Sequence, residues 1–341
     1  MQINSKYAEF QQFLIKERNL TEEQTQETIK IVEDFVHFLE KESERTIENA
    51  NAVDLERYAP ILIDTKKNTD ETFIALIRYS SFVKNDSLII ALYELWDGYN
   101  VLTSLSDKIR EELGEEKWSK IFSDIVIPPL GSQNANRPKI TQKLMENFEG
   151  AVDAKTCRNL LAKYYLHTGP FSAEYKTKLR KKFLNAKNID EFLKNKHQEY
   201  LQFLEGLMNE KKLYYTQEIT PEVLEFVREN PIVTGIREGN KILEIKIPYN
   251  TKEYLKASDD IEKRYHYCHC MWAKESIKNQ DVNVSPTFCY CSASYHKQYW
   301  DSYFDQLVEI EVLENVLEAD SLVCKFAITI PENIMKDLEK K

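Results

Sequence analysis

The sequence predicts an α+β fold in which an acidic helical bundle precedes a domain with an antiparallel sheet. Apolar residues recur at helical spacing through residues 5–125, and β-branched runs with period 2 occur only after residue 230. The 341 residues include only 8 Gly and 10 Pro, with 42% hydrophobic and 30% charged residues. This composition is typical of a helix-rich globular protein, and the length favours two domains.

Residues 1–126 are predicted to form the helical bundle. Thr21 is the expected N-cap of a helix whose apolar stripe runs from Ile29 to Leu39. Helical spacing continues over residues 71–84 and again over 86–113, where we expect a cap at Asp86–Ser87. Positions 1–125 hold 25 acidic and 15 basic residues, which is the whole negative excess of the chain. Nucleic acid is therefore not an expected partner.

Residues 127–139, which contain Pro and Gly, are the predicted linker, and residues 140–341 are the predicted α+β domain. We expect helices over 140–230 and the sheet within 231–341. One strand pair should turn at Glu238-Gly239-Asn240, and a second should lie within residues 307–331. A helix over residues 292–307 should lead into the second pair.

Several function classes are excluded by missing motifs. The chain has no G-x-G-x-x-G, no G-x-x-x-x-G-K-[ST] and no H-E-x-x-H, so the common nucleotide and metalloprotease fingerprints are absent. It has no signal-peptide pattern and no run of 18 apolar residues, so we expect a cytoplasmic protein without a membrane segment. Six cysteines are too few for a disulfide scaffold, and five of them fall in the last quarter of the chain.

Two short segments combine these cysteines with histidines: RYHYCHCMWAKES at 264–276 and TFCYCSASYHKQYW at 287–300. If residues 265–270 are extended, His266, Cys268 and Cys270 share one face. The same argument places Cys289 and Cys291 together, and Cys324 belongs to the core side of the last strand. We therefore expect three segments to bring thiols to one place.

Three interpretations of these thiols stay open. The first is that they are metal ligands. A zinc site needs four N/S ligands, and the chain offers five candidates, namely His266, Cys268, Cys270, Cys289 and Cys324. A Cys-x-Cys pair, however, chelates one ion only where the backbone bends. As a nucleophile, Cys291 precedes Ser292, the expected cap of a helix whose positive end lowers a thiol pKa, and His296 is the candidate base. As structural residues, the cysteines fill core beside aromatic side chains.

The segment from about residue 260 to 331 resembles the small α+β domain of L-2-amino-thiazoline-4-carboxylic acid hydrolases and of vinyl-reductase-type small-molecule sensors. The resemblance is carried by Cys268 or Cys270, by Cys289 or Cys291 ahead of a helix, and by EADSLVCKF with Cys324. It implies a small-molecule ligand and, in the hydrolase group, attack on a cyclic imine or carbonyl-type substrate. In the sensor group it implies zinc, with Glu314 and Cys324 as the nearest matching ligands.

The N-terminal pattern, FLIKERNLTEEQTQETIKIVEDFVHFLEK followed by NANAVDLERYAPIL and TFIALIRYSSFV, is similar to the helical core-binding domain of tyrosine recombinases. Its acidic charge speaks against a DNA role. The predicted function is small-molecule binding or hydrolysis at the Cys-rich site. The alternatives are a zinc-binding sensor or interaction module and a helical adaptor with a purely structural C-terminal domain. The pocket of the leading prediction is expected to include His269, Trp272, Tyr290, Tyr295 and Glu314.

Overall fold

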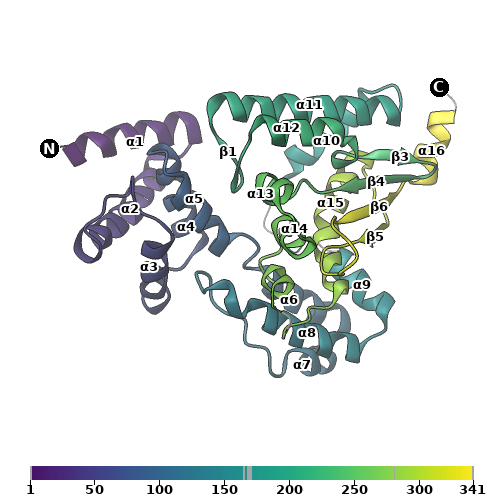
Figure 1. The fold of residues 1–341 in the computed structure, drawn as a ribbon, viewed down its shortest axis with the longest axis horizontal. Coiled ribbons are helices and arrows are strands. Elements are labelled where there is room, and N and C mark those ends of the chain that lie inside the picture. Colours follow the sequence, from purple (N-terminus) through teal and green to yellow (C-terminus); the bar gives the residue numbers. More distant parts are fainter. Residues whose placement is uncertain (1, 164–165, 167–170, 280, 340–341) are drawn as a thin grey trace. The chain divides into compact units, whose positions relative to one another are not determined.

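The computed structural model describes residues 2–163, 166, 171–279 and 281–339 of the chain. They form a mixed α+β fold with a large helical N-terminal part, which confirms the predicted fold class (Figure 1). The chain divides into two compact units. Unit 1 comprises Met1–Tyr99 and Pro128–Asn134, and unit 2 comprises Asn100–Ile127 and Ala135–Lys341.

Unit 1 is a bundle of helices held by one apolar core. In α2, Thr21 accepts a hydrogen bond from the Gln24 backbone N–H while the Gln24 side chain accepts one from Thr21, so the predicted cap is confirmed as a capping box. The buried residues of α2 include Ile29, Val32 and Leu39, as the apolar stripe predicts. The helices are α1 (Gln2–Arg18), α2 (Glu22–Glu42), α3 (Ala52–Asp64), α4 (Asp70–Phe82) and α5 (Asp86–Trp96).

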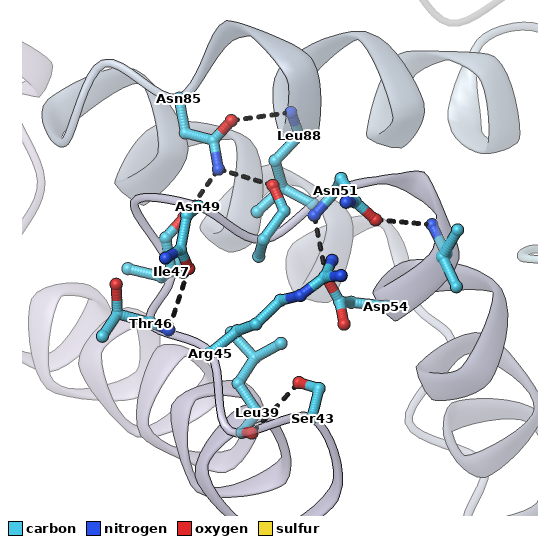
Figure 2. A network of polar contacts seen from close by, with 12 residues as sticks. Leu39, Ser43, Arg45, Thr46, Ile47, Asn49, Asn51, Asp54, Asn85 and Leu88 are labelled. Atoms are coloured by element: carbon cyan, nitrogen blue, oxygen red, sulfur yellow. Dashed lines mark hydrogen bonds and ion pairs between the residues drawn. The ribbon is translucent and has the colours of Figure 1, made fainter.

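A polar network fixes the loop between α2 and α3 (Figure 2). The Asn85 amide donates to the carbonyl oxygens of Ile47 at 2.6 Å and Ala50 at 2.8 Å, and its oxygen accepts from the Leu88 N–H at 3.0 Å. Asn85 thus caps α5 and holds the loop at the same time. The predicted cap at Asp86–Ser87 is wrong by one residue.

The long helical pattern over 86–113 is broken in the structure. Helix α5 ends at Trp96, Gly98 takes a positive φ of 66°, and α6 (Val101–Leu113) begins after Asn100. Glycine adopts that backbone conformation without steric cost, which explains the break. The two units divide at this point, so α6 and α7 (Glu115–Phe122), which the sequence grouped with the N-terminal bundle, belong to unit 2.

Unit 2 contains the larger core and a four-stranded antiparallel sheet in the order β3-β4-β6-β5. Both predicted strand pairs are present, and the first turns at Gly239 with a φ of 60°. The strands are β1 (Leu213–Tyr214), β2 (Gln217–Glu218), β3 (Ile236–Glu238), β4 (Lys241–Ile245), β5 (Ile310–Glu314) and β6 (Lys325–Thr329). After α6 and α7, the helices are α8 (Arg137–Ala151), α9 (Ala154–Lys163), α10 (Ala173–Leu184), α11 (Ile189–Glu210), α12 (Pro221–Glu229), α13 (Thr251–Lys256), α14 (Asp260–Tyr267), α15 (Cys289–Phe304) and α16 (Glu332–Glu339).

Helix α15 packs on the face of the sheet that carries Ile242, Phe326 and Ile328 (Figure 1). The His296 ring lies 4.5 Å from the Phe326 ring, and the fully buried Trp300 follows one turn later. Among the described helices, none combines the length and apolar composition needed to cross a membrane.

Candidate functional site

Both Cys-x-Cys segments adopt a conformation that differs from the expected one. Residues 260–267 form α14, in which Asp259 accepts from the Glu262 N–H as N-cap and Cys268 is the C-cap. Cys289 and Cys291 lie in the first turn of α15, because the short 3-10 turn Pro286–Phe288 leads directly into the helix. Ser292 is therefore inside the helix, so the predicted Ser292 cap and the extended conformation of Cys289–Cys291 are wrong. In the other segment, residues 265–267 are helical, whereas Cys268 has an extended backbone conformation.

The centre of the α15–sheet interface is a buried carboxylate, Glu244 on β4. Its Oε1 accepts from Lys196 Nζ at 2.5 Å, and its Oε2 accepts from His296 Nδ1 and from Trp300 Nε1, each at 3.0 Å. The Lys196 amine also lies 4.6 Å from the Trp300 ring. Three donors therefore compensate the removal of this carboxylate from water.

The geometry of this network determines which of its side chains are ionised. Burial works to raise the pKa of Glu244, but Lys196 and the bond from His296 outweigh it and lower the pKa to about 2. Burial lowers the pKa of His296 even though Glu244 opposes the shift. The lowered pKa of Glu244 and the lowered pKa of His296 are consistent when Lys196 is the counter-ion of the carboxylate. The imidazole then stays neutral and donates an ordinary hydrogen bond.

The second ring nitrogen of His296, Nε2, takes no part in the contact with Glu244. A carboxylate only accepts, so Nδ1 must carry the ring proton and Nε2 must present a lone pair. Within the described part of the chain, Nε2 has no hydrogen-bond partner, and 14% of the side chain is exposed. The site thus presents an unpaired acceptor that water can reach.

Lys246 lies two residues beyond Glu244 and so continues the same face of β4. The β4–β6 register ends with Ile245 opposite Lys325, so Lys246 and Cys324 are the residues directly beyond the paired ends of the two strands. Lys246 is half-buried, and no carboxylate among the described residues forms an ion pair with it. Its positive charge therefore has no ion-pair partner within the part of the chain that the structure describes.

All five C-terminal cysteines lie within electrostatic range of this lysine. Burial raises the pKa of each thiol, to about 12 for Cys291 and Cys324, and in every case the positive charge of Lys246 acts in the opposite direction. Cys289 is close enough for the charges of Cys268, Cys270 and Cys324 to raise its own pKa further. Thiols from the three segments therefore lie within electrostatic range of one another, and at neutral pH the sulfurs are protonated. We call Lys246, His296, Cys268, Cys270, Cys289 and Cys324 the thiol site.

The thiol site differs from the predicted catalytic pair. Cys291 packs with Trp272 and Phe288 in one apolar cluster, whereas His296 faces Glu244 and the sheet. Five positions along a helix rotate a side chain by about 140°, so Cys291 and His296 point in different directions. Cys289 is seven positions before His296, about two turns, and therefore shares its face. Cys289 and Cys270 are the half-buried thiols, while Cys268, Cys291 and Cys324 are buried.

The predicted metal ligands do not assemble into a chelating group. Among the described residues, no three or more His, Cys, Asp or Glu side chains are placed to hold a metal ion. His266 lies in the last turn of α14 with its Nε2 3.3 Å from Glu262. Glu314, at the end of β5, lies 3.9 Å from Lys325. The ligand set required for zinc is thus not formed by this arrangement of side chains.

The remaining predicted pocket residues have other neighbours. His269 Nε2 lies 2.7 Å from the carbonyl oxygen of Ile247, which fixes the ring beside the segment after β4. Tyr290 lies under the Arg158 guanidinium at 5.7 Å. Trp272 is buried, with the guanidinium of the buried Arg137 5.1 Å from its ring. Tyr295 directs its hydroxyl to Tyr299 at 3.1 Å, on the flank of α15.

Sequence reasoning missed Glu244, Lys246 and Lys196. A signal for two of them is present in the alternation of β4, because Ile242, Glu244 and Lys246 occupy one face of a strand whose other face is also apolar. Charged residues at such positions need polar partners, which Glu244 finds and Lys246 does not. Lys196 lies 48 residues away on α11, and no local pattern connects it to β4.

A depression on the surface of α10 is separate in composition from the thiol site. It is lined by Glu174, Thr177, Lys178, Lys181, Lys182 and Asn185. All six residues recur at helical spacing on one face of a single helix, which is typical of a solvated surface. It includes no residue of the thiol site.

Comparisons with protein-family models, with curated proteins and with solved structures give no match to this chain. The resemblances seen in the sequence therefore stay expectations. Function has to be inferred from the two unpaired polar atoms, Lys246 Nζ and His296 Nε2, and from the thiols beside them.

Proposed function

We propose that unit 2 binds a small anionic molecule at the thiol site. The observation that carries the proposal is Lys246, a half-buried cation without a carboxylate partner among the described residues. A lysine in surroundings of neutral thiols and neutral imidazoles gains from an opposite charge brought by a ligand. A carboxylate is the simplest group that supplies it.

His296 adds a second requirement for the ligand. Its Nε2 lone pair accepts a hydrogen bond, so a ligand held by Lys246 gains further from an N–H or O–H donor. The tautomer is fixed by Glu244, which means that the acceptor is preorganised rather than selected on binding. An acid that also carries a nitrogen or oxygen donor fits both contacts.

The thiols form the weakly polar wall of the site in this proposal. Because burial raises the pKa of Cys270, Cys289 and Cys324, these side chains are neutral near pH 7 and contribute sulfur surface rather than thiolate charge. For a hydrolytic reaction, the proton acceptor of the site is therefore His296 Nε2. Neutral free thiols persist in a reducing compartment, which supports the proposal of a cytoplasmic protein.

The test uses L-2-amino-thiazoline-4-carboxylate, the compound that the sequence resemblance suggests and one that carries both an acid and nitrogen donors. Isothermal titration should show saturable binding to the wild-type chain, weakened about tenfold or more by Lys246→Met, because one charged contact is lost. Lys241→Met is the matched control, since Lys241 lies on the same strand and pairs with Glu311 at the surface.

The neutral amide of the same compound separates charge from shape. The amide should bind wild type and Lys246→Met alike. Equal binding of the carboxylate to wild type and Lys246→Met would refute the assignment of Lys246, and absence of binding to the wild type would remove this class of ligand.

A further inference from the structure

The hairpin formed by β1 and β2 contains a strained residue. Its register pairs Tyr214 with Gln217, which leaves Tyr215 and Thr216 as a two-residue turn. Tyr215 has a φ of 54°, in the left-handed region. Two-residue hairpin turns with positive φ at the first position favour glycine, and a bulky side chain there costs about 1–2 kcal/mol.

The contacts of Tyr215 do not explain why a tyrosine occupies this position. Its side chain is 53% exposed, and its hydroxyl lies 3.4 Å from the Tyr295 hydroxyl, a long and water-accessible contact. Its ring meets the Tyr214 ring at 4.9 Å. Backbone strain that packing does not compensate is a feature of functional segments.

The hairpin is attached to both elements that carry the thiol site. On one side, Tyr215 reaches Tyr295 of α15, the residue before His296. On the other side, the buried Gln217 side chain donates to the Pro248 carbonyl and accepts from the Thr251 N–H, each at 3.0 Å. Pro248 lies two residues after Lys246. The Gln217 attachment is buried and doubly bonded, whereas the Tyr215 attachment is exposed and single.

We propose that the hairpin Leu213–Glu218 is a strap that controls access to the thiol site, with Gln217 as its fixed attachment and Tyr215 as its releasable one. The strain stored at Tyr215 lowers the cost of breaking its contact with Tyr295, so the turn opens while β2 stays in place. The use of this strap in ligand entry rests on the proposed function. Its opening is measurable without any ligand.

The test is the rate at which iodoacetamide alkylates the half-buried thiols Cys289 and Cys270, followed by peptide mass spectrometry under native conditions. Tyr215→Phe and Tyr295→Phe each remove the hydroxyl contact and should accelerate alkylation about threefold. The double variant should react no faster than Tyr295→Phe, because that single variant already lacks the Tyr215–Tyr295 contact. Tyr215→Gly relieves the strain and removes the ring, so it should accelerate alkylation most without lowering the melting temperature.

Lys211→Gly is the matched control. Lys211 also has a positive φ, 53°, and ends α11 just before the hairpin, with an exposed side chain. Glycine there relieves similar strain without touching the Tyr215–Tyr295 contact, so alkylation should match the wild type. Unchanged rates in all four tyrosine variants, or an equal acceleration in Lys211→Gly, would overturn the strap. Neither result depends on whether a carboxylate binds at Lys246.

Discussion

A buried polar network around Asn85 in unit 1 and another around Glu244 in unit 2 differ in how they end. In unit 1, the Asn85 amide and oxygen make three hydrogen bonds, all with backbone groups of the same unit (Figure 2). In unit 2, Glu244 is equally saturated, but the network continues to His296 Nε2, which has no partner among the described residues. Lys246 lies beside it, without a carboxylate.

This difference separates a structural network from a candidate site. A network in which every group is paired stabilises the fold and has nothing to offer a ligand. A network that holds a donor or acceptor in place without a hydrogen-bond partner lowers the stability of the fold, unless a ligand supplies that partner. Substitutions in the two networks should therefore differ in size and in kind.

The largest effect is expected for Glu244→Ala. Removing the carboxylate leaves the donors of His296 and Trp300 without their acceptor, and leaves the Lys196 charge with only the Thr234 carbonyl, in a largely buried environment. Breaking a buried pair in this way costs about 3–5 kcal/mol of unfolding free energy. Urea unfolding followed by the hydrogen exchange of unit 2 peptides measures the loss. Glu311→Ala, at an exposed ion pair, is the control and should change stability by less than about 0.5 kcal/mol.

The pH dependence of stability should also separate the units. The folded pKa of Glu244, about 2, is below its ordinary value of 4.5, so its contribution is present above pH 4.5 and is lost as the pH falls toward 2. His296 has a lowered pKa, so its protonation below its ordinary 6.5 also opposes folding. Wild-type unit 2 should lose up to about 3 kcal/mol more than Glu244→Gln over the acid range. Parallel stability curves for the two proteins would show that Glu244 does not carry this dependence.

Asn85→Ala is the matching change in unit 1. The loop carbonyls of Ile47 and Ala50 lose their donor and α5 loses its N-cap, so we expect a loss of about 2 kcal/mol of unfolding free energy. Hydrogen exchange should rise in α5 and in the loop between α2 and α3, while the alkylation of Cys289 in unit 2 stays unchanged. A change in that alkylation rate would contradict the view of this network as purely structural.

Much of the fold was accessible from the sequence because its signals are local. Thr21 with Gln24, and Gly239 between two β-branched runs, are each specified within a few residues. The alternation argument for residues 265–270 assumes an extended segment, but residues 265–267 form the last turn of α14. The Asp259 cap and the burial of Tyr267 against the core favour α14 instead. Tertiary packing decided between two locally plausible conformations.

The candidate site was accessible only in part. The cysteines were visible as a cluster in sequence, and in the structure one lysine acts electrostatically on all five of the C-terminal ones. The Glu244 network was not visible, because its members come from β4, α11 and α15 and meet only after folding. A sequence pattern can show that Glu244 and Lys246 occupy buried positions, but it cannot show which of the two finds a partner.

The smallest effect is expected for Lys246→Met, and it concerns thiol chemistry rather than stability. Lys246 lowers the pKa of each surrounding thiol, so its removal should slow the alkylation of Cys289 and Cys270 by about two- to fivefold at pH 8. Melting temperature should change little, since Lys246 forms no ion pair among the described residues. Lys241→Met should leave both quantities as in the wild type. If Lys246→Met alkylates at the wild-type rate while Glu244→Gln does not, Glu244 rather than Lys246 controls the reactivity of the thiols. The comparison between the fully paired network of unit 1 and the partly unpaired network of unit 2 would then have to rest on Glu244.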